Sequence, residues 1–166
     1  MKGMISVAAV LLFVGFSAFA ADKAPDKVAD KAPAPEVQLS PVGRWETIDD
    51  KKGKVTSVVE IVEKDGIMTG TIEKLVVEPG EDPTPKCDKC KGDLKDKPVV
   101  GMRILWDLKK DKKEKSEWSD GRILDPDNGE TYRCYIGVQD GGKKLKVRGY
   151  LGIALFGRTQ YWKKAE

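Results

Sequence analysis

The sequence predicts an all-β protein: a closed barrel of eight antiparallel strands in up-and-down order. Short runs rich in β-branched and aromatic residues alternate with clusters of Asp, Asn and Gly that favour turns. After the first 41 residues, no window of about 11 residues has the apolar spacing of a helix. Closure is expected because an open meander would leave two strand edges unpaired.

The N-terminal part of the chain is expected to lie outside the barrel. Residues 1–20 combine Lys2, an apolar run and a final Ala-Phe-Ala, which is the pattern of a secretory signal peptide cleaved after Ala20. Residues 21–41 alternate Ala, Pro, Lys and Asp, and they bury too little apolar surface to offset the entropy lost on ordering. We therefore expect a disordered linker, a barrel domain at 42–166 and a periplasmic or secreted protein that does not span the membrane after cleavage.

The strands are expected between the turn-forming clusters. The clearest turn signals are the pair Asp65-Gly66 and the stretches 125–129 and 140–142. The expected strands are 44–49, 55–63, 67–77, 98–108, 117–124, 130–138, 144–150 and 152–162. Eight strands enclose an interior that side chains nearly fill or that holds one small ligand.

The first and last strands are expected to meet and close the barrel. Gly43 and Trp45 open the first strand, and Arg158 lies in the last one, with Arg148 nearby as the alternative. A flat, delocalised guanidinium stacks well on the face of a tryptophan. We therefore predict that Arg158 covers Trp45 at the closure.

These residues also carry a resemblance. Gly43-x-Trp45 resembles the first-strand signature of lipocalins and the wider calycin group, in which the tryptophan packs under an arginine near the end of the barrel. The domain as a whole resembles the uncharacterised bacterial family called domain of unknown function 2147, through residues 43–50, 87–101, 121–134 and 147–162. The resemblance implies a secreted or periplasmic, lipocalin-like barrel. It implies no reaction, because the family has no assigned chemistry.

Three cysteines allow several interpretations. Cys87 and Cys90 lie in the long loop 78–97, and in an oxidising compartment they are expected to form a structural disulfide. A redox-active pair is the alternative, although such a pair usually needs a helix N-terminus. Cys134 is expected to be buried, and a disulfide from Cys134 to the loop stays open. A metal site has little support, because the chain has no histidine.

Catalysis and nucleic-acid binding also have little support in the sequence. The usual base at neutral pH is missing with histidine, and there is no nucleophile elbow or phosphate-binding loop. The net charge of +3 is too small to indicate a nucleic-acid partner. We therefore predict no cofactor and no metal, and a hydrolase or redox enzyme is the less favoured reading.

Two function classes fit the predicted barrel. The first is binding of a small apolar or amphipathic molecule in the barrel, with the loop 78–97 as a lid. The second is a cell-envelope interaction protein whose barrel is filled by its own side chains and that acts through its surface. The candidates for contact with a ligand are aromatic residues: Trp106, Trp118, Tyr132 and Phe156.

Overall fold

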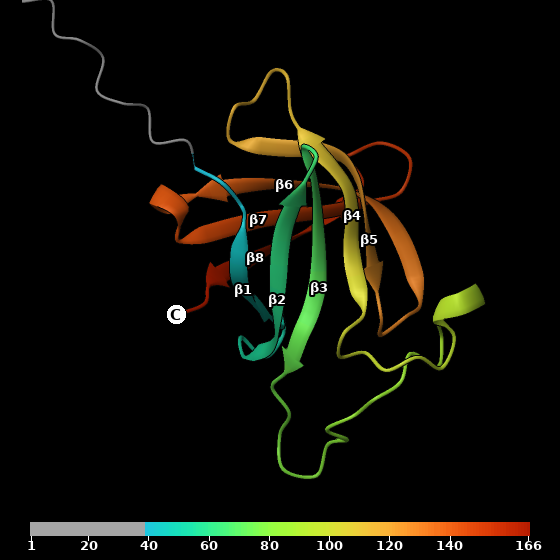
Figure 1. Ribbon diagram of the computed structural model, residues 1–166. Helices are drawn as coiled ribbons and strands as arrows, with labels where there is room; N and C mark the ends of the chain where they lie inside the picture. Colours follow the sequence, from blue (N-terminus) through green and yellow to red (C-terminus); the bar gives the residue numbers. More distant parts are fainter. Residues whose placement is uncertain (1–38) are drawn as a thin grey trace, which may run out of the picture. The chain divides into compact units, whose positions relative to one another are not determined.

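The computed structural model describes residues 39–166, which form a closed barrel of eight antiparallel strands (Figure 1). The predicted fold class is confirmed, since each strand pairs with the next and the last pairs with the first. The predicted signal peptide and nearly all of the predicted linker lie outside the described residues. The strands are β1 (Gly43–Ile48), β2 (Val55–Lys64), β3 (Ile67–Leu75), β4 (Arg103–Lys110), β5 (Glu117–Asp125), β6 (Glu130–Gln139), β7 (Lys144–Tyr150) and β8 (Gly157–Lys164).

Two strands begin later than the sequence predicts. β4 begins at Arg103 because the preceding loop continues through Gly101, whose φ of 84° is left-handed and interrupts an extended strand. β8 begins at Gly157 because residues 151–156 form a loop instead of continuing the strand. Two one-turn 3₁₀ helices, η1 (Gly92–Leu94) and η2 (Asp140–Gly142), lie in connections.

The two ends of the barrel differ. At one end, here called the mouth end, lie the loops 49–54, 76–102, 126–129 and 151–156. The opposite end carries the turns 65–66, 111–116 and 140–143 and the C-terminus, and residues 39–42 enter the barrel there. We call it the tryptophan end, because it contains Trp45, Trp118 and Trp162, all of which are buried.

The barrel closes around Trp45. β1 and β8 pair at only two positions, one of which is Trp45 opposite Lys164. Trp45 is fully buried, and its Nε1 donates a hydrogen bond to the Pro41 carbonyl at 2.7 Å. Lys164 Nζ lies 4.5 Å from the centre of the Trp45 ring and donates to the Val42 carbonyl at 3.0 Å. Burial lowers the pKa of Lys164, and a partly desolvated cation is attracted more strongly to an aromatic face.

The prediction that Arg158 covers Trp45 is wrong, because Lys164 occupies that position. β8 starts at the mouth end and runs on to Lys164, so that its last residue and not Arg158 reaches the tryptophan end. Arg158 lies at the start of β8 and forms an ion pair with Asp50 at 2.7 Å. The predicted tryptophan and the predicted strand are correct, but the cation comes from the other end of that strand.

Side chains fill the interior of the barrel. A Cβ atom added to Gly121 would lie 2.3 Å from Leu108 Cγ, and one added to Gly70 would lie 2.9 Å from Leu105 Cδ1. These leucines therefore occupy the space that the two glycines leave free. The core cluster includes the following buried residues of the barrel strands: Trp45, Val59, Ile61, Met68, Leu105, Leu108, Trp118, Cys134, Ile136, Leu145, Val147 and Trp162.

We expect Gly121→Ala to lower the free energy of unfolding by about 1–3 kcal/mol, because the new methyl group must displace Leu108 in a packed interior. Urea unfolding measures the change. Gly137→Ala is the matched control, since its Cβ would meet only the flexible Glu117 side chain, at 3.2 Å. Equal stability of the two variants would contradict a filled interior at this layer.

Candidate ligand site at the barrel mouth

An exposed apolar loop forms part of the rim of the mouth. Four of its side chains are 61–76% exposed: Leu151, Ile153, Leu155 and Phe156. Arg148, the alternative partner predicted for Trp45, instead holds this loop. Its Nε donates to the Ala154 carbonyl at 2.8 Å, and its Nη2 donates to the Leu155 carbonyl at 3.1 Å. The loop backbone is thus fixed by one guanidinium while its apolar side chains face outward.

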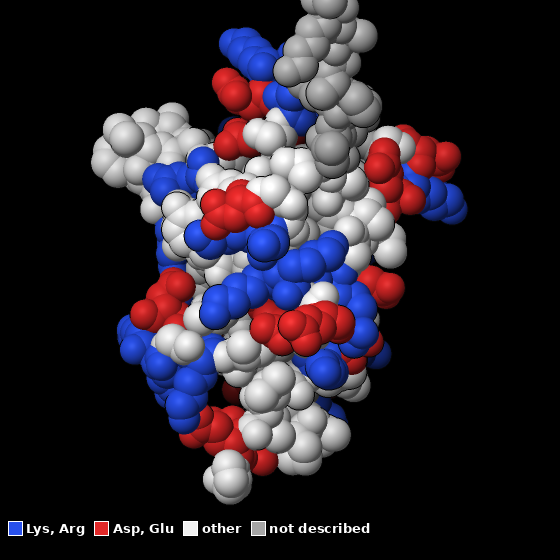
Figure 2. All heavy atoms as spheres, turned by 90° about the vertical axis from the view of Figure 1, so that its left-hand side faces the viewer, with Lys and Arg blue, Asp and Glu red and all other residues white. Residues whose placement is uncertain are grey.

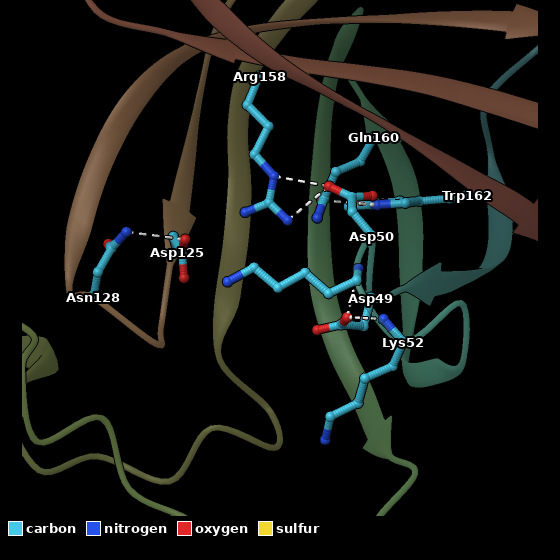
Figure 3. Close-up of polar contacts among 9 residues, drawn as sticks. Asp49, Asp50, Lys52, Asp125, Asn128, Arg158, Gln160 and Trp162 are labelled. Carbon is cyan, nitrogen blue, oxygen red and sulfur yellow. Dashed lines mark hydrogen bonds and ion pairs between the residues drawn. The ribbon is translucent and has the colours of Figure 1, made fainter.

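Beside this loop, an ion pair bridges the open seam between β1 and β8. Here β1 and β8 are not paired. Arg158 Nε donates a hydrogen bond to Asp50 Oδ2 at 2.8 Å, and Arg158 Nη2 forms an ion pair with the same oxygen at 2.7 Å (Figure 3). The preceding Asp49 accepts hydrogen bonds from two backbone N–H groups of the 49–54 turn, which fixes the turn. The hydrogen bond with Asp50 is the main cause that raises the pKa of Arg158, and the charges of Asp125 and Asp49 add to it. The guanidinium therefore lies among carboxylates.

The turn 125–129 lies on the other side of the mouth in Figure 3. Asp125 accepts hydrogen bonds from the backbone N–H of Asp127 and from Asn128 Nδ2, both at 3.0 Å. Asn128 Nδ2 also donates to the Tyr132 hydroxyl at 3.1 Å. Desolvation, followed by the charge of Asp125, raises the pKa of Asp127. This side of the mouth is therefore polar and predominantly acidic.

The inner face of β8 changes from polar to apolar along its length. Arg158, Gln160 and Trp162 alternate along the strand, and Trp162 pairs with the buried Leu145 of β7. Trp162 Nε1 donates to Gln160 Oε1 at 3.4 Å (Figure 3). The sequence left open which face of this strand points inward, and the burial of Trp162 answers that question.

The predicted disulfide between Cys87 and Cys90 is confirmed. Both residues are buried, and their loop docks on the turn 125–129. Lys89 Nζ donates to the Asp127 carbonyl at 2.8 Å. A Cβ on Gly129 would lie only 2.0 Å from the Lys89 carbonyl oxygen, so only glycine permits this approach. The loop predicted as a lid is thus packed against one side of the mouth.

Cys134 is a free, buried thiol on β6. The alternative of a disulfide between Cys134 and the loop is therefore wrong, because the two loop cysteines pair with each other. Burial raises the pKa of Cys134 to about 12. The thiol stays protonated at neutral pH, which makes it a poor nucleophile.

The aromatic ligand candidates are not gathered in one place. Tyr132 and Phe156 lie at the mouth end. Trp118 packs in the core at the tryptophan end, with Lys110 Nζ 3.8 Å from its ring centre. Trp106 lies on β4 opposite the exposed Arg122 of β5 and points to the outside of the barrel.

Sequence reasoning missed two parts of the mouth. Residues 152–156 are predicted as the start of the last strand, whereas the structure has a loop there, in which Gly152 has a left-handed φ of 71°. Asp50 gave no signal, because an aspartate in a surface turn has many uses and only the fold brings it to Arg158.

We expect Gly129→Ala to release the disulfide loop from the turn, because its methyl group would overlap the Lys89 carbonyl. Hydrogen exchange at the backbone amides of residues 86–99 should become faster. Gly53→Ala is the matched control: its φ of 66° is close to the 72° of Gly129, but its Cβ meets no atom within 4 Å. If hydrogen exchange of residues 86–99 became faster to the same extent in both variants, backbone strain alone would account for the change, and the overlap with Lys89 would not.

Comparison with known proteins supports this description. The family model DUF2147, described as an uncharacterized protein conserved in bacteria, matches residues 43–164. Among solved structures, protein HP1028 from the human pathogen Helicobacter pylori, described as belonging to the lipocalin family, is similar with a TM-score of 0.64 and 22% identity, over 77% of this chain and 84% of that one. No curated protein matches the chain. The barrel is therefore lipocalin-like.

No helix in residues 39–166 has the length and apolar character needed to cross a bilayer. Within the same part of the chain, no three or more His, Cys, Asp or Glu side chains are grouped so that they could hold a metal ion.

Proposed function

Since the chain belongs to DUF2147, a family of uncharacterised bacterial proteins, and folds as a lipocalin-like barrel, we propose that it binds a small amphipathic molecule at the barrel mouth. The observation that carries the proposal is the exposed apolar loop 151–156 directly beside the polar start of β8. Such a molecule would place its apolar part against the loop and its polar part near Arg158.

The apolar part of the proposal rests on the exposure of four large side chains in six consecutive residues. Scattered apolar residues are normal on a protein surface, but a contiguous group is typical of a binding surface. Arg148 fixes the loop backbone through the Ala154 and Leu155 carbonyls, so these side chains do not turn inward. Covering a leucine or phenylalanine side chain fully is worth about 1.5–3 kcal/mol.

The polar part of the proposal rests on the charges around Arg158. Its Nε and Nη2 already bind Asp50, and Asp49 and Asp125 lie close enough to interact with its charge. An anionic head group would be repelled by these carboxylates, and a cationic one would be repelled by Arg158. An uncharged head group that forms hydrogen bonds avoids both repulsions. Gln160 offers an amide for such a hydrogen bond on the same inner face.

The packing of the interior favours the mouth over the deep lumen. Leu105 and Leu108 fill the layers at Gly70 and Gly121, so an acyl chain there would need several side chains to move. The alternative function, a filled barrel that acts through its surface, is compatible with the same packing. The two functions differ in whether a small molecule binds at all.

We expect the protein to bind monolaurin, an uncharged twelve-carbon amphiphile, below its critical micelle concentration. The double variant Leu155→Ser/Phe156→Ser should bind at least about tenfold more weakly, which corresponds to about 1.4 kcal/mol. Isothermal titration calorimetry measures both affinities. Both residues are exposed, so the variant should unfold at the same temperature as the wild type.

The matched control is Val42→Ser/Val62→Ser, which removes two exposed apolar side chains, 42% and 45% exposed, far from the mouth. Its affinity should equal that of the wild type. Absence of binding to the wild type, or equal weakening in both double variants, would contradict the mouth as the binding site. The first of these results would favour a barrel that acts through its surface.

The confirmed disulfide also supports the predicted export from the cytoplasm. A structural Cys87–Cys90 bridge persists in oxidising compartments and is rare in the cytosol. Periplasmic or secreted location stays a prediction, because residues 1–20 lie outside the described part of the chain. N-terminal sequencing of the protein from its own cells checks it.

A further inference from the structure

Two arginines lie directly opposite each other on the outer surface of the barrel. Arg122 of β5 pairs with Arg133 of β6 in the antiparallel register. Both are exposed, whereas their chain neighbours Gly121 and Cys134 face the buried interior. Directly opposite residues have Cβ atoms about 4.5–5.5 Å apart, and like charges at that separation repel each other.

Neither arginine has a partner among the described residues that offsets this repulsion. Within residues 39–166, no hydrogen bond or ion pair involves the side chain of Arg122 or Arg133. The other arginines differ: Arg44 binds Glu73, Arg158 binds Asp50 and Arg148 binds loop carbonyls. Arg103 also lacks a partner in the described part of the chain, but its cross-strand neighbour is Thr71.

On another face of the molecule, basic and acidic side chains lie next to each other. Figure 2 shows Lys and Arg interspersed with Asp and Glu there. On the β5–β6 surface, by contrast, two neighbouring cations share no carboxylate. The repulsion between the two arginines lowers the stability of the fold unless an anion binds between them.

The surroundings of the pair form a shallow pocket of about 450 Å³, lined by Arg122, Thr131, Tyr132 and Arg133. Thr131 lies two residues before Arg133 and is exposed on the same face, so its hydroxyl can also donate a hydrogen bond. The same cross-strand row continues to Trp106 on one side and Tyr150 on the other. The donors are therefore flanked by aromatic residues.

We propose that Arg122, Arg133 and Thr131 form a binding site for a phosphate group on the outer face of the barrel, whereas the mouth site lies at the loop 151–156 and the inner face of β8. A guanidinium presents two parallel N–H groups that match two phosphate oxygens. Two such groups and a hydroxyl suit a tetrahedral oxyanion better than one flat carboxylate. The phosphate belongs either to a soluble molecule or to a lipid head group, and the site chemistry is the same for both.

The test is a titration with inorganic phosphate at constant ionic strength, followed by ¹⁵N NMR of the folded protein. We expect saturable shifts of the backbone amides of Arg122, Thr131 and Arg133. In Arg122→Gln/Arg133→Gln, the affinity should fall at least tenfold. In phosphate-free buffer, this variant should unfold at the same temperature as the wild type or a higher one, because the repulsion is gone.

The matched control is Lys64→Gln/Lys74→Gln, which removes two positive charges from β2 and β3. It should bind phosphate like the wild type. The proposal is overturned if both double variants lose affinity equally, or if the wild type shows no saturable shift and no arginine-dependent binding to vesicles. A lower unfolding temperature of the arginine variant in phosphate-free buffer would also overturn it, since the pair would then be structural.

Sedimentation with vesicles distinguishes the two sources of the phosphate. The wild type is incubated with vesicles of phosphatidylglycerol and phosphatidylcholine, and with vesicles of phosphatidylcholine alone. Arginine-dependent sedimentation with the anionic vesicles supports the site and assigns it to lipid head groups. Arginine-dependent binding of inorganic phosphate without sedimentation supports the site and assigns it to a soluble phosphate compound.

Discussion

The closure of the barrel at Trp45 determines how the rest of the structure is arranged. β1 and β8 pair at two positions only, and Lys164 covers the Trp45 ring. The Pro41 carbonyl accepts a hydrogen bond from Trp45, and the Val42 carbonyl accepts one from Lys164. The buried Trp45 ring and its shielded cation–π contact stabilise the closure of β1 with β8 at the tryptophan end. The other end of the same seam has no backbone pairing and is crossed by the Arg158–Asp50 ion pair.

This asymmetry separates a packed end from a polar, accessible one. Along the inner face of β8, the side chains change from Arg158 through Gln160 to the buried Trp162. The ion pair itself is solvent-exposed, and such pairs are worth little in stability. Its polar atoms lie next to the apolar loop 151–156, and this is the surface at which we propose that an amphipathic molecule binds.

The sequence predicted the fold well because strand periodicity and turn chemistry are local properties. Asp65-Gly66 and the turn 125–129 lie where turns were expected, and β2, β6 and β7 differ by at most one residue from the predicted strands. The disulfide also followed from local spacing. The cation on Trp45 did not, since its identity depends on where β8 ends. Likewise, the meeting of Asp50 with Arg158, 108 residues apart, depends on the whole barrel.

A crystal structure of the protein with monolaurin tests binding at the mouth most directly. We expect the acyl chain against residues 151–156 and the glycerol group near Arg158 and Gln160, with Leu105 and Leu108 in the positions they have without ligand. An acyl chain deep in the lumen between Trp118 and Trp162, with these leucines displaced, would contradict the claim that the interior is filled and that binding is confined to the mouth.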